Sequence, residues 1–228
     1  MPGDVDIASI AALLADPTRS NILLVLSDGR ALPAGELARG ARVSPSTASA
    51  HLARLMEAGL LAVEKQGRHR YFRLADLAIV QALEALALVA PPRTVHSLRE
   101  ADVADAVRQA RTCYNHLAGA LGVALTQALV DKQFLSLATD GYAVTDCGER
   151  WFRDFGIDCA ALKRPDNLFA PHHIDWSERR YHLAGALGAA FTRRLFDLGW
   201  LTRAPSSRAV RLTASGREAI LAEFELHL

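Results

Sequence analysis

Cysteine and histidine side chains that could bind a metal ion or act in catalysis gather in the second half of the 228-residue sequence. Cys113 and His116 stand three residues apart in RTCYNHLAG, and on a helix this spacing would place them on one face. A thiolate beside an imidazole is a ligand pair for a soft or borderline metal ion. The other candidates for an effector or metal site are Cys159, His172, His173 and His182.

Several other interpretations of these residues stay open. Cys113 and His116 could be a buried thiol beside a capping histidine, or the nucleophile and base of an enzyme. An enzyme would also need an orienting group and an oxyanion site, and the sequence shows neither, so we expect no catalytic residues. A small apolar effector is the alternative to a metal ion, and no cofactor is required. Its pocket could be lined by aromatic residues, although such residues more often form a core: Trp151, Phe152, Phe155, Trp176 and Trp200.

His116 and His182 also occupy equivalent positions of two similar segments. HLAGALGVALTQALVDKQFL begins at His116 and HLAGALGAAFTRRLFDLGWL begins at His182, and the two segments agree without gaps at most positions, including the first seven. We therefore expect a structural role for both histidines, capping or bridging across a pseudo-two-fold axis. We also expect the two glycine-containing helices to cross near their glycines.

The stretch SPSTASAHLARLMEAGLL, from Ser44 to Leu61, has the residue types of a helix that docks into DNA. Its leucines and methionine recur at helical spacing and should face a core, which leaves short polar side chains and Arg54 on the other faces. The major groove admits an α-helix, and such side chains can donate hydrogen bonds to base edges or phosphates. The predicted DNA contacts are Ser44, Ser46, Thr47, Ser49, His51, Arg54, Lys65, Arg68, His69 and Arg70.

The charge distribution agrees with a phosphate-binding surface. The whole chain has a formal net charge of only +1, but seven basic and two acidic residues lie between Arg39 and Arg73. A localised basic stripe is typical of nucleic-acid binding, although a solvated charged surface can look the same.

The elements that must position these residues form two predicted domains, 1–92 and 93–228. The first reads as four helices, a β-hairpin around Gln66-Gly67 and a last helix, closed by Pro91-Pro92. Asp16 and Ser44 are predicted helix caps, each followed by proline at the first helical position. The second domain should contain two internal helix-hairpin-helix repeats, at about 111–157 and 177–224. The expected fold is therefore mainly α with small β-hairpins.

Composition limits the class of protein. Half of the residues are hydrophobic and 22% are charged, as in globular proteins. No apolar run is long enough for a membrane span, and MPGDVDIASI lacks the features of a signal peptide, so we expect a cytoplasmic protein without a membrane partner. Three cysteines without a CxxC pair indicate reduced thiols.

Three separated motifs, LADPTRSNILLVL, GELARGARVSPSTASAHLARLMEAGLL and EKQGRHRYFRL, resemble the ArsR family of winged-helix transcriptional regulators. The resemblance covers about residues 7 to 90. It implies a homodimer that pairs through the first and last helices of this domain and binds double-stranded operator DNA as a repressor until an effector releases it. It also implies a recognition helix at Ser44 to Ala58 and a wing at Leu61 to Leu74.

The sequence departs from the metal sensors of that family. GELARGA lacks their Cys-x-Cys, and DLAIVQALEALALV lacks the ligand set of the zinc sensors. We therefore expect sensing in the duplicated C-terminal domain. The alternatives are a metal- or thiol-responsive repressor that uses Cys113 and His116, and a winged-helix protein-interaction adaptor that does not bind DNA.

Overall fold

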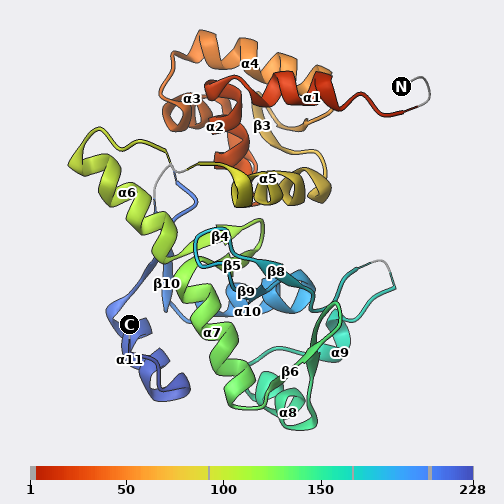
Figure 1. Ribbon diagram of the computed structural model, residues 1–228, viewed down its shortest axis with the longest axis vertical. Helices are drawn as coiled ribbons and strands as arrows, with labels where there is room; N and C mark the ends of the chain where they lie inside the picture. Colours follow the sequence, from red (N-terminus) through yellow and green to blue (C-terminus); the bar gives the residue numbers. More distant parts are fainter. Residues whose placement is uncertain (1–3, 92, 166, 205–206, 228) are drawn as a thin grey trace. The chain divides into compact units, whose positions relative to one another are not determined.

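The computed structural model describes residues 4–91, 93–165, 167–204 and 207–227 (Figure 1). They form two compact units. The first contains the chain to Glu84 together with Ser207 and Arg208, and the second contains Ala85–Ala204 and the chain from Ala209. Pro92, the expected domain boundary, lies outside the described residues. The division between the units falls earlier, inside the helix α5 (Leu77–Val89).

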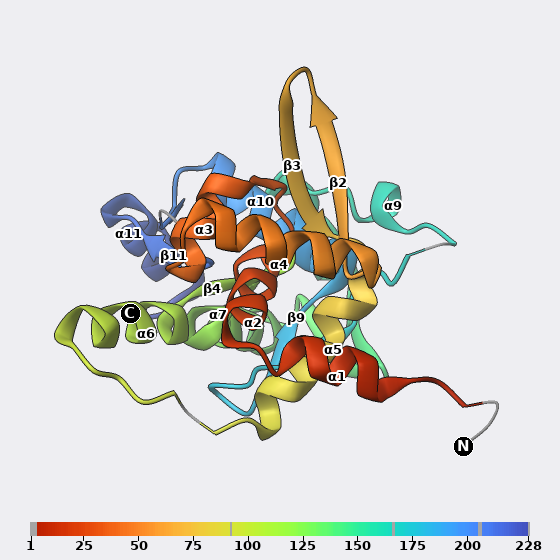
Figure 2. The ribbon, with the colours of Figure 1, turned by 90° about the horizontal axis from the view of Figure 1, so that it is seen from above.

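The first unit is a winged helix-turn-helix. Its helices are α1 (Ile7–Leu14), α2 (Pro17–Leu26), α3 (Ala34–Ala41), α4 (Pro45–Glu57) and the start of α5. The strands β2 (Leu61–Gln66) and β3 (His69–Leu74) form an antiparallel hairpin that extends away from α2, α3 and α4 (Figure 2). The sequence did not predict β1 (Leu32–Pro33), which adds a third strand beside β3, because two residues are too short for an alternating pattern.

Caps and a small apolar core hold the first unit together. The side chains of Asp16 and Ser44 accept hydrogen bonds from the backbone N–H groups of Arg19 and Thr47, so both predicted caps are confirmed. The fully buried side chains that join α2, α3 and α4 are Ile22, Leu23, Leu26, Leu37, Leu52 and Leu55. Burial of one face of α4 fixes which of its side chains remain outside.

The second unit is helical with small two-stranded sheets. In chain order its elements are α6 (Leu98–Gln109), β4 (Arg111–Cys113), β5 (His116–Ala118), α7 (Gly119–Asp131), β6 (Leu135–Ala138), β7 (Gly141–Val144), α8 (Asp146–Asp154), α9 (Cys159–Leu162), β8 (His172–Ile174), β9 (Tyr181–Leu183), α10 (Gly185–Asp197), β10 (Leu201–Arg203), β11 (Val210–Leu212) and α11 (Ala214–Phe224). Consecutive strands pair as antiparallel hairpins. A hairpin therefore precedes both α7 and α10, and another follows each of them.

The hairpins before α7 and α10 correct one prediction. Cys113 and His116 do not share a helix face, because they lie in β4 and β5 and oppose each other across the hairpin. The helices begin only at Gly119 and Gly185, whose φ angles are +82° and +67°. Glycine adopts this left-handed conformation without strain, so the HLA segments stay extended and the helix begins after them.

The helical glycines do not provide the expected helix crossing. A Cβ atom on Gly122 would lie 2.6 Å from the carbonyl oxygen of Leu117, and one on Gly188 would lie 2.6 Å from that of Leu183. Each glycine therefore makes room for the strand that precedes its own helix. From the other segment, the Cβ atom of His116 comes near Gly188: it would lie 3.2 Å from a Cβ atom placed on that glycine.

Among the described residues, no single helix is long and apolar enough to cross a membrane, although the bent pair α1 and α2 meets that criterion by length and composition alone.

Candidate nucleic-acid interface and a buried cysteine–histidine cluster

The outer face of α4 consists of short side chains, Arg54 and, at the end of the helix, Glu57. Ala48, Leu52 and Leu55 are buried in the first unit. From Ser46 onwards, the exposed residues of α4 are Ser46, Thr47, Ser49, Ala50, Ala53, Arg54 and Glu57. A face of this kind lets the backbone of α4 come close to a groove wall, and Arg54 can reach beyond the small residues.

Hydroxyl groups form a short chain at the start of α4. The hydroxyl of Ser44 lies 2.9 Å from that of Ser46 and 2.8 Å from that of Thr47, and it also caps the helix. Ser49 donates to the carbonyl oxygen of Pro45. Because a hydroxyl has one donor and two acceptor sites, Ser46 and Thr47 can each make a further hydrogen bond, whereas the hydroxyl of Ser44 caps the helix.

His51 points towards the body of its unit. Its ring is half-buried, and Nδ1 lies 3.7 Å from Oδ1 of Asp16 at the start of α2. The hydrogen bond from the backbone N–H of Arg19 lowers the pKa of Asp16, so its carboxylate is charged beside the ring.

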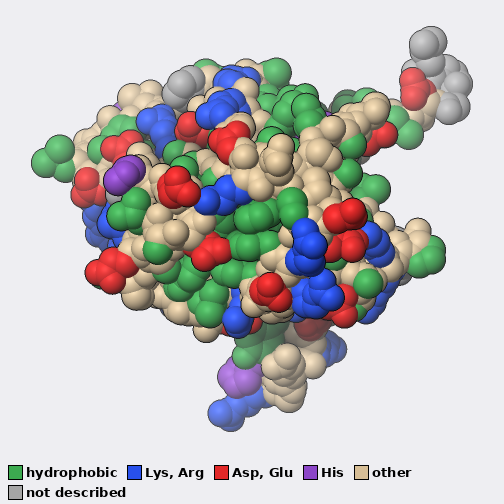
Figure 3. Space-filling view, turned by 90° about the horizontal axis from the view of Figure 1, so that it is seen from below, with side chains coloured by type: hydrophobic (Ala, Val, Ile, Leu, Met, Phe, Trp, Pro, Cys, Tyr) green, Lys and Arg blue, Asp and Glu red, His purple; other side chains and the backbone are tan. Residues whose placement is uncertain are grey.

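The β2–β3 hairpin carries the other predicted contacts on its exposed tip: Lys65, Arg68, His69 and Arg70. In the space-filling view, basic and histidine side chains gather on the projection at the bottom (Figure 3). The Arg70 guanidinium also lies over the Phe72 ring, 5.4 Å from its centre. Arg73 forms a 2.6 Å ion pair with Glu64, so its charge is largely neutralised and contributes less to the basic stripe.

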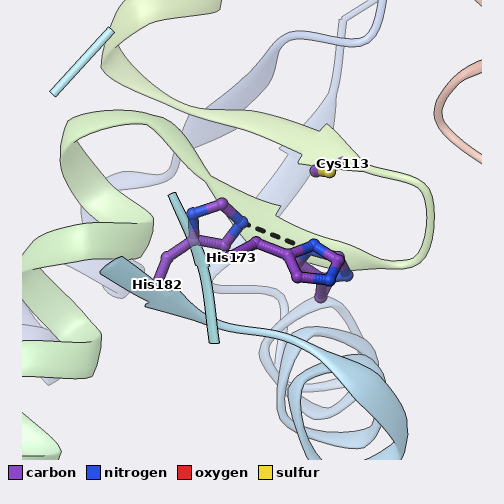
Figure 4. Close-up of side chains that lie close together, drawn as sticks. Cys113, His173 and His182 are labelled. Carbon is purple, nitrogen blue, oxygen red and sulfur yellow. Dashed lines mark hydrogen bonds between the residues drawn. The ribbon is translucent and has the colours of Figure 1, made fainter. Parts of the chain in front are cut away.

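Four of the candidate effector residues meet inside the second unit. Cys113 opposes His116 across the β4–β5 hairpin, and His173 opposes His182 across the β8–β9 hairpin. Directly opposed residues extend from the same face of a hairpin, so each hairpin presents a pair of ligand atoms. All four ligand atoms lie within 4.8 Å of one another. Figure 4 shows three of these side chains, Cys113, His173 and His182, close together. His116 and His182 contact through their Nε2 atoms at 3.2 Å.

The cluster is buried and has a charged pair beside it. Cys113, His116 and His182 are at most 2% exposed, and His173 is half-buried. Burial, the neighbouring His182 and His173 rings and Arg111 lower the pKa of His116 well below its usual value, so its ring is neutral at neutral pH.

The charged pair consists of Arg111 and Asp175, whose side chains are fully buried and 2.9 Å apart. Oδ2 of Asp175 also accepts a hydrogen bond from the backbone N–H of Gly119 and lies 3.7 Å from Nδ1 of His182. Burial alone would raise the pKa of Asp175. The Arg111 charge and the hydrogen bonds from Ser177 and Gly119 outweigh burial and lower this pKa, so the carboxylate remains ionised.

The other effector candidates lie outside the cluster. His172 packs its ring against Tyr181, with ring centres 4.0 Å apart. Cys159 is buried at the start of α9, where burial raises the pKa of its thiol. The Trp151 ring stacks on the rings of Phe134 and Phe155, and the ring centres are 4.8 Å apart in both pairs. These aromatic residues pack against the core.

Sequence reasoning missed two threonines that join the halves of the second unit. Thr126 on α7 accepts a hydrogen bond from the backbone N–H of Leu183, and Thr192 on α10 accepts one from that of Leu117. The signal was present, because threonine is one of the residues that HLAGALGVALTQ and HLAGALGAAFTR share.

The fold and the exposed face of α4 define a helix-turn-helix regulator, and known proteins agree. The Helix-turn-helix domain family matches residues 14–64. The HTH-type transcriptional regulator YdfF from Bacillus subtilis is 46% identical over 223 residues, which are 98% of this chain and 97% of that protein. The HTH-type transcriptional regulator CmtR from Mycobacterium tuberculosis is 39% identical over 83 residues, 36% of this chain and 70% of that protein.

Solved structures match a shorter part of the chain. The cadmium metal-sensor CmtR from Mycobacterium tuberculosis has 34% sequence identity and a TM-score of 0.33, with 41% of this chain and 100% of that chain covered. HlyU from Vibrio cholerae has 28% identity and a TM-score of 0.34, with 36% of this chain and 88% of that chain covered.

The near full-length match to YdfF shows that the chain belongs to the HTH-type transcriptional regulators. It is a DNA-binding regulator of the ArsR-like type, as the three motifs in its first ninety residues indicate.

Proposed function

We propose that the protein is a transcriptional repressor that binds a two-fold-related operator as a homodimer, in the cytoplasm where that DNA lies. An effector bound in the second unit releases it. The observation that carries the proposal is the combination, within one unit, of the small exposed face of α4 with the basic tip of the β2–β3 hairpin.

In the proposed complex, α4 lies in the major groove. Ser46, Thr47 and Ser49 approach base edges and phosphates, and Arg54 donates to a base edge or a phosphate. The hairpin tip contacts phosphates or the minor groove through Lys65, Arg68, His69 and Arg70. Ser44 acts through the cap of α4, and His51 acts through its contact with Asp16.

The exposed apolar surface of α1 supports a dimer. None of the residues of α1 is buried, although its sequence IASIAALL is almost wholly apolar. Ile7 at the start of α1 is 71% exposed, and Val5 just before the helix is 76% exposed. Apolar surface of this kind is stabilised when a second copy covers it, and two copies present two recognition helices to half-sites about 10 bp apart, or a multiple of that.

We also propose that the second unit arose by internal duplication, as two helix-hairpin-helix repeats. Thr145 and Thr213 cap α8 and α11 in the same way, through hydrogen bonds from the N–H groups of Gly148 and Gly216. A Cβ on Gly148 would meet the carbonyl oxygen of Phe134, and one on Gly216 would meet that of Trp200. The same local packing in both segments supports a common origin.

The proposal is tested by selecting DNA sites for the full-length protein from a random library and measuring its affinity for the best site by gel shift. We expect a site with two-fold symmetry and a dimer in analytical ultracentrifugation. Ile7→Glu should shift the protein towards monomers and reduce operator affinity while its circular dichroism spectrum is unchanged. An asymmetric site bound by a monomer, or no enriched site, would overturn the proposal.

A further inference from the structure

Two hairpins bring one thiol and three imidazoles to a single point in the second unit. Cys113 and His116 come from β4 and β5, and His173 and His182 come from β8 and β9. Each hairpin therefore contributes two potential ligands. Fixed strand pairing positions both pairs, because a change of register by one residue would turn a ligand to the opposite face.

The donor set is that of a tetrahedral transition-metal site. Zinc is held by four thiolate or imidazole ligands, with bonds to nitrogen of about 2.0–2.1 Å, which places two nitrogen ligands about 3.3 Å apart. The Nε2 atoms of His116 and His182 are 3.2 Å apart. All four ligand atoms lie within 4.8 Å of one another, so the longest remaining edges need to contract by up to about 1.5 Å around an ion.

The neighbouring charges are those of the Arg111–Asp175 ion pair, with the carboxylate nearest to His182. Asp175 lies 3.7 Å from Nδ1 of His182 and is itself held by Arg111 and by the N–H of Gly119. This distance is too long for a hydrogen bond, but a contraction of a few tenths of an ångström would place the carboxylate on the outer nitrogen of His182, where it would orient the ring and make the inner nitrogen a better ligand. His173 is the least buried of the four ligands, so an ion can enter from its side.

We propose that Cys113, His116, His173 and His182 bind one divalent transition-metal ion, with Zn²⁺ as the favoured ion. The thiolate and imidazoles disfavour Mg²⁺ and Ca²⁺, which prefer oxygen ligands. Binding displaces the thiol proton of Cys113, and the proton between the Nε2 atoms of His116 and His182 moves to the outer nitrogen of its own ring, so one proton leaves for each ion. The site is independent of the proposed function, because its test does not involve DNA.

The first experiment uses the full-length protein purified without chelators. Elemental analysis should find one Zn²⁺ per chain. After the metal is removed with a chelator, titration with Co²⁺ should give the intense visible absorption of a tetrahedral site and a sulfur-to-cobalt charge-transfer band. Cys113→Ser should remove the charge-transfer band, and the matched control Cys159→Ser should leave it unchanged.

The second experiment separates ligation from folding. His173→Ala changes the least buried ligand, and His172→Ala changes its neighbour on the same strand, which lies outside the cluster. In competition with a chromophoric chelator, His173→Ala should lower Zn²⁺ affinity by more than about 100-fold, since changes outside the ligand shell already cost about 10- to 100-fold. His172→Ala should bind like the wild type. A protein that takes up no Zn²⁺ or Co²⁺, or equal affinity of both variants and the wild type, would overturn the proposal.

Discussion

His116 and His182 lie 66 residues apart in the sequence, and their Nε2 atoms are 3.2 Å apart inside the second unit. Each histidine occupies the strand before a helix that begins with the same GALG residues. Two reciprocal hydrogen bonds flank this pair, from Leu183 to Thr126 and from Leu117 to Thr192. Each segment therefore completes the hydrogen bonding of the other.

The reciprocal threonines should be equally important for stability. Thr126→Val and Thr192→Val keep the side-chain shape but leave the buried N–H of Leu183 or Leu117 without an acceptor. Each change should lower the free energy of unfolding by about 1–3 kcal/mol. Chemical denaturation of both variants measures this, with the exposed Thr202→Val as the control. Wild-type stability of either variant would contradict the reciprocal role.

Loss of the Arg111–Asp175 ion pair should lower the free energy of unfolding more than loss of either threonine hydroxyl. Both side chains are fully buried, so Asp175→Asn leaves the Arg111 charge without its carboxylate. Removal of one partner of a buried pair costs about 3–5 kcal/mol. The exposed pair of Lys163 and Glu149 provides the control, because Glu149→Gln should cost no more than about 1 kcal/mol. If Asp175→Asn and Glu149→Gln lowered the free energy of unfolding equally, burial of the Arg111–Asp175 pair would have no energetic consequence.

An acidic side chain on α4 should prevent DNA binding. Ser46→Glu or Ser49→Glu places a bulky negative charge on the face that we assign to the major groove, where phosphates and the loss of close approach oppose it. Gel shifts should show no specific complex, whereas Ser136→Glu, the same change at an exposed site of the second unit, should bind normally. Retained affinity in a folded Ser46→Glu or Ser49→Glu protein would remove the recognition-helix assignment.

The wing should contribute affinity more than specificity. The double variant Arg68→Ala/Arg70→Ala should bind specific and non-specific DNA sites more weakly to a similar degree. The slope of log affinity against log salt concentration should fall by the equivalent of up to about two counterions. The matched control is Arg150→Ala with Arg153→Ala on α8, where both side chains are exposed. A salt slope unchanged by the wing substitutions would mean that the hairpin does not contact DNA.

The sequence predicted the first unit far better than the cysteine–histidine cluster. Asp16-Pro17 and Ser44-Pro45 are local signals for a helix start, so the sequence alone predicted where α2 and α4 begin. The cluster depends on strand pairing between residues distant in sequence, and the three-residue spacing of Cys113 and His116 fits a helix as well as a hairpin. His173 opposes His182 only because β8 and β9 pair around an intervening loop. No periodic pattern marks strands of three residues.

Metal binding at the four-ligand site should stabilise the folded protein. An ion that binds only the native state adds about 2.7 kcal/mol of stability when its free concentration is 100 times its dissociation constant. Thermal unfolding of metal-free protein, followed by circular dichroism with increasing buffered Zn²⁺, should therefore show a rising Tm. His173→Ala should flatten this dependence and His172→Ala should retain it, because only the former removes a ligand. Mg²⁺ at the same free concentration should have no effect, since the site offers no oxygen ligands. A Tm that does not respond to Zn²⁺, or responds equally in both histidine variants, would show that these four residues pack against one another without binding an ion.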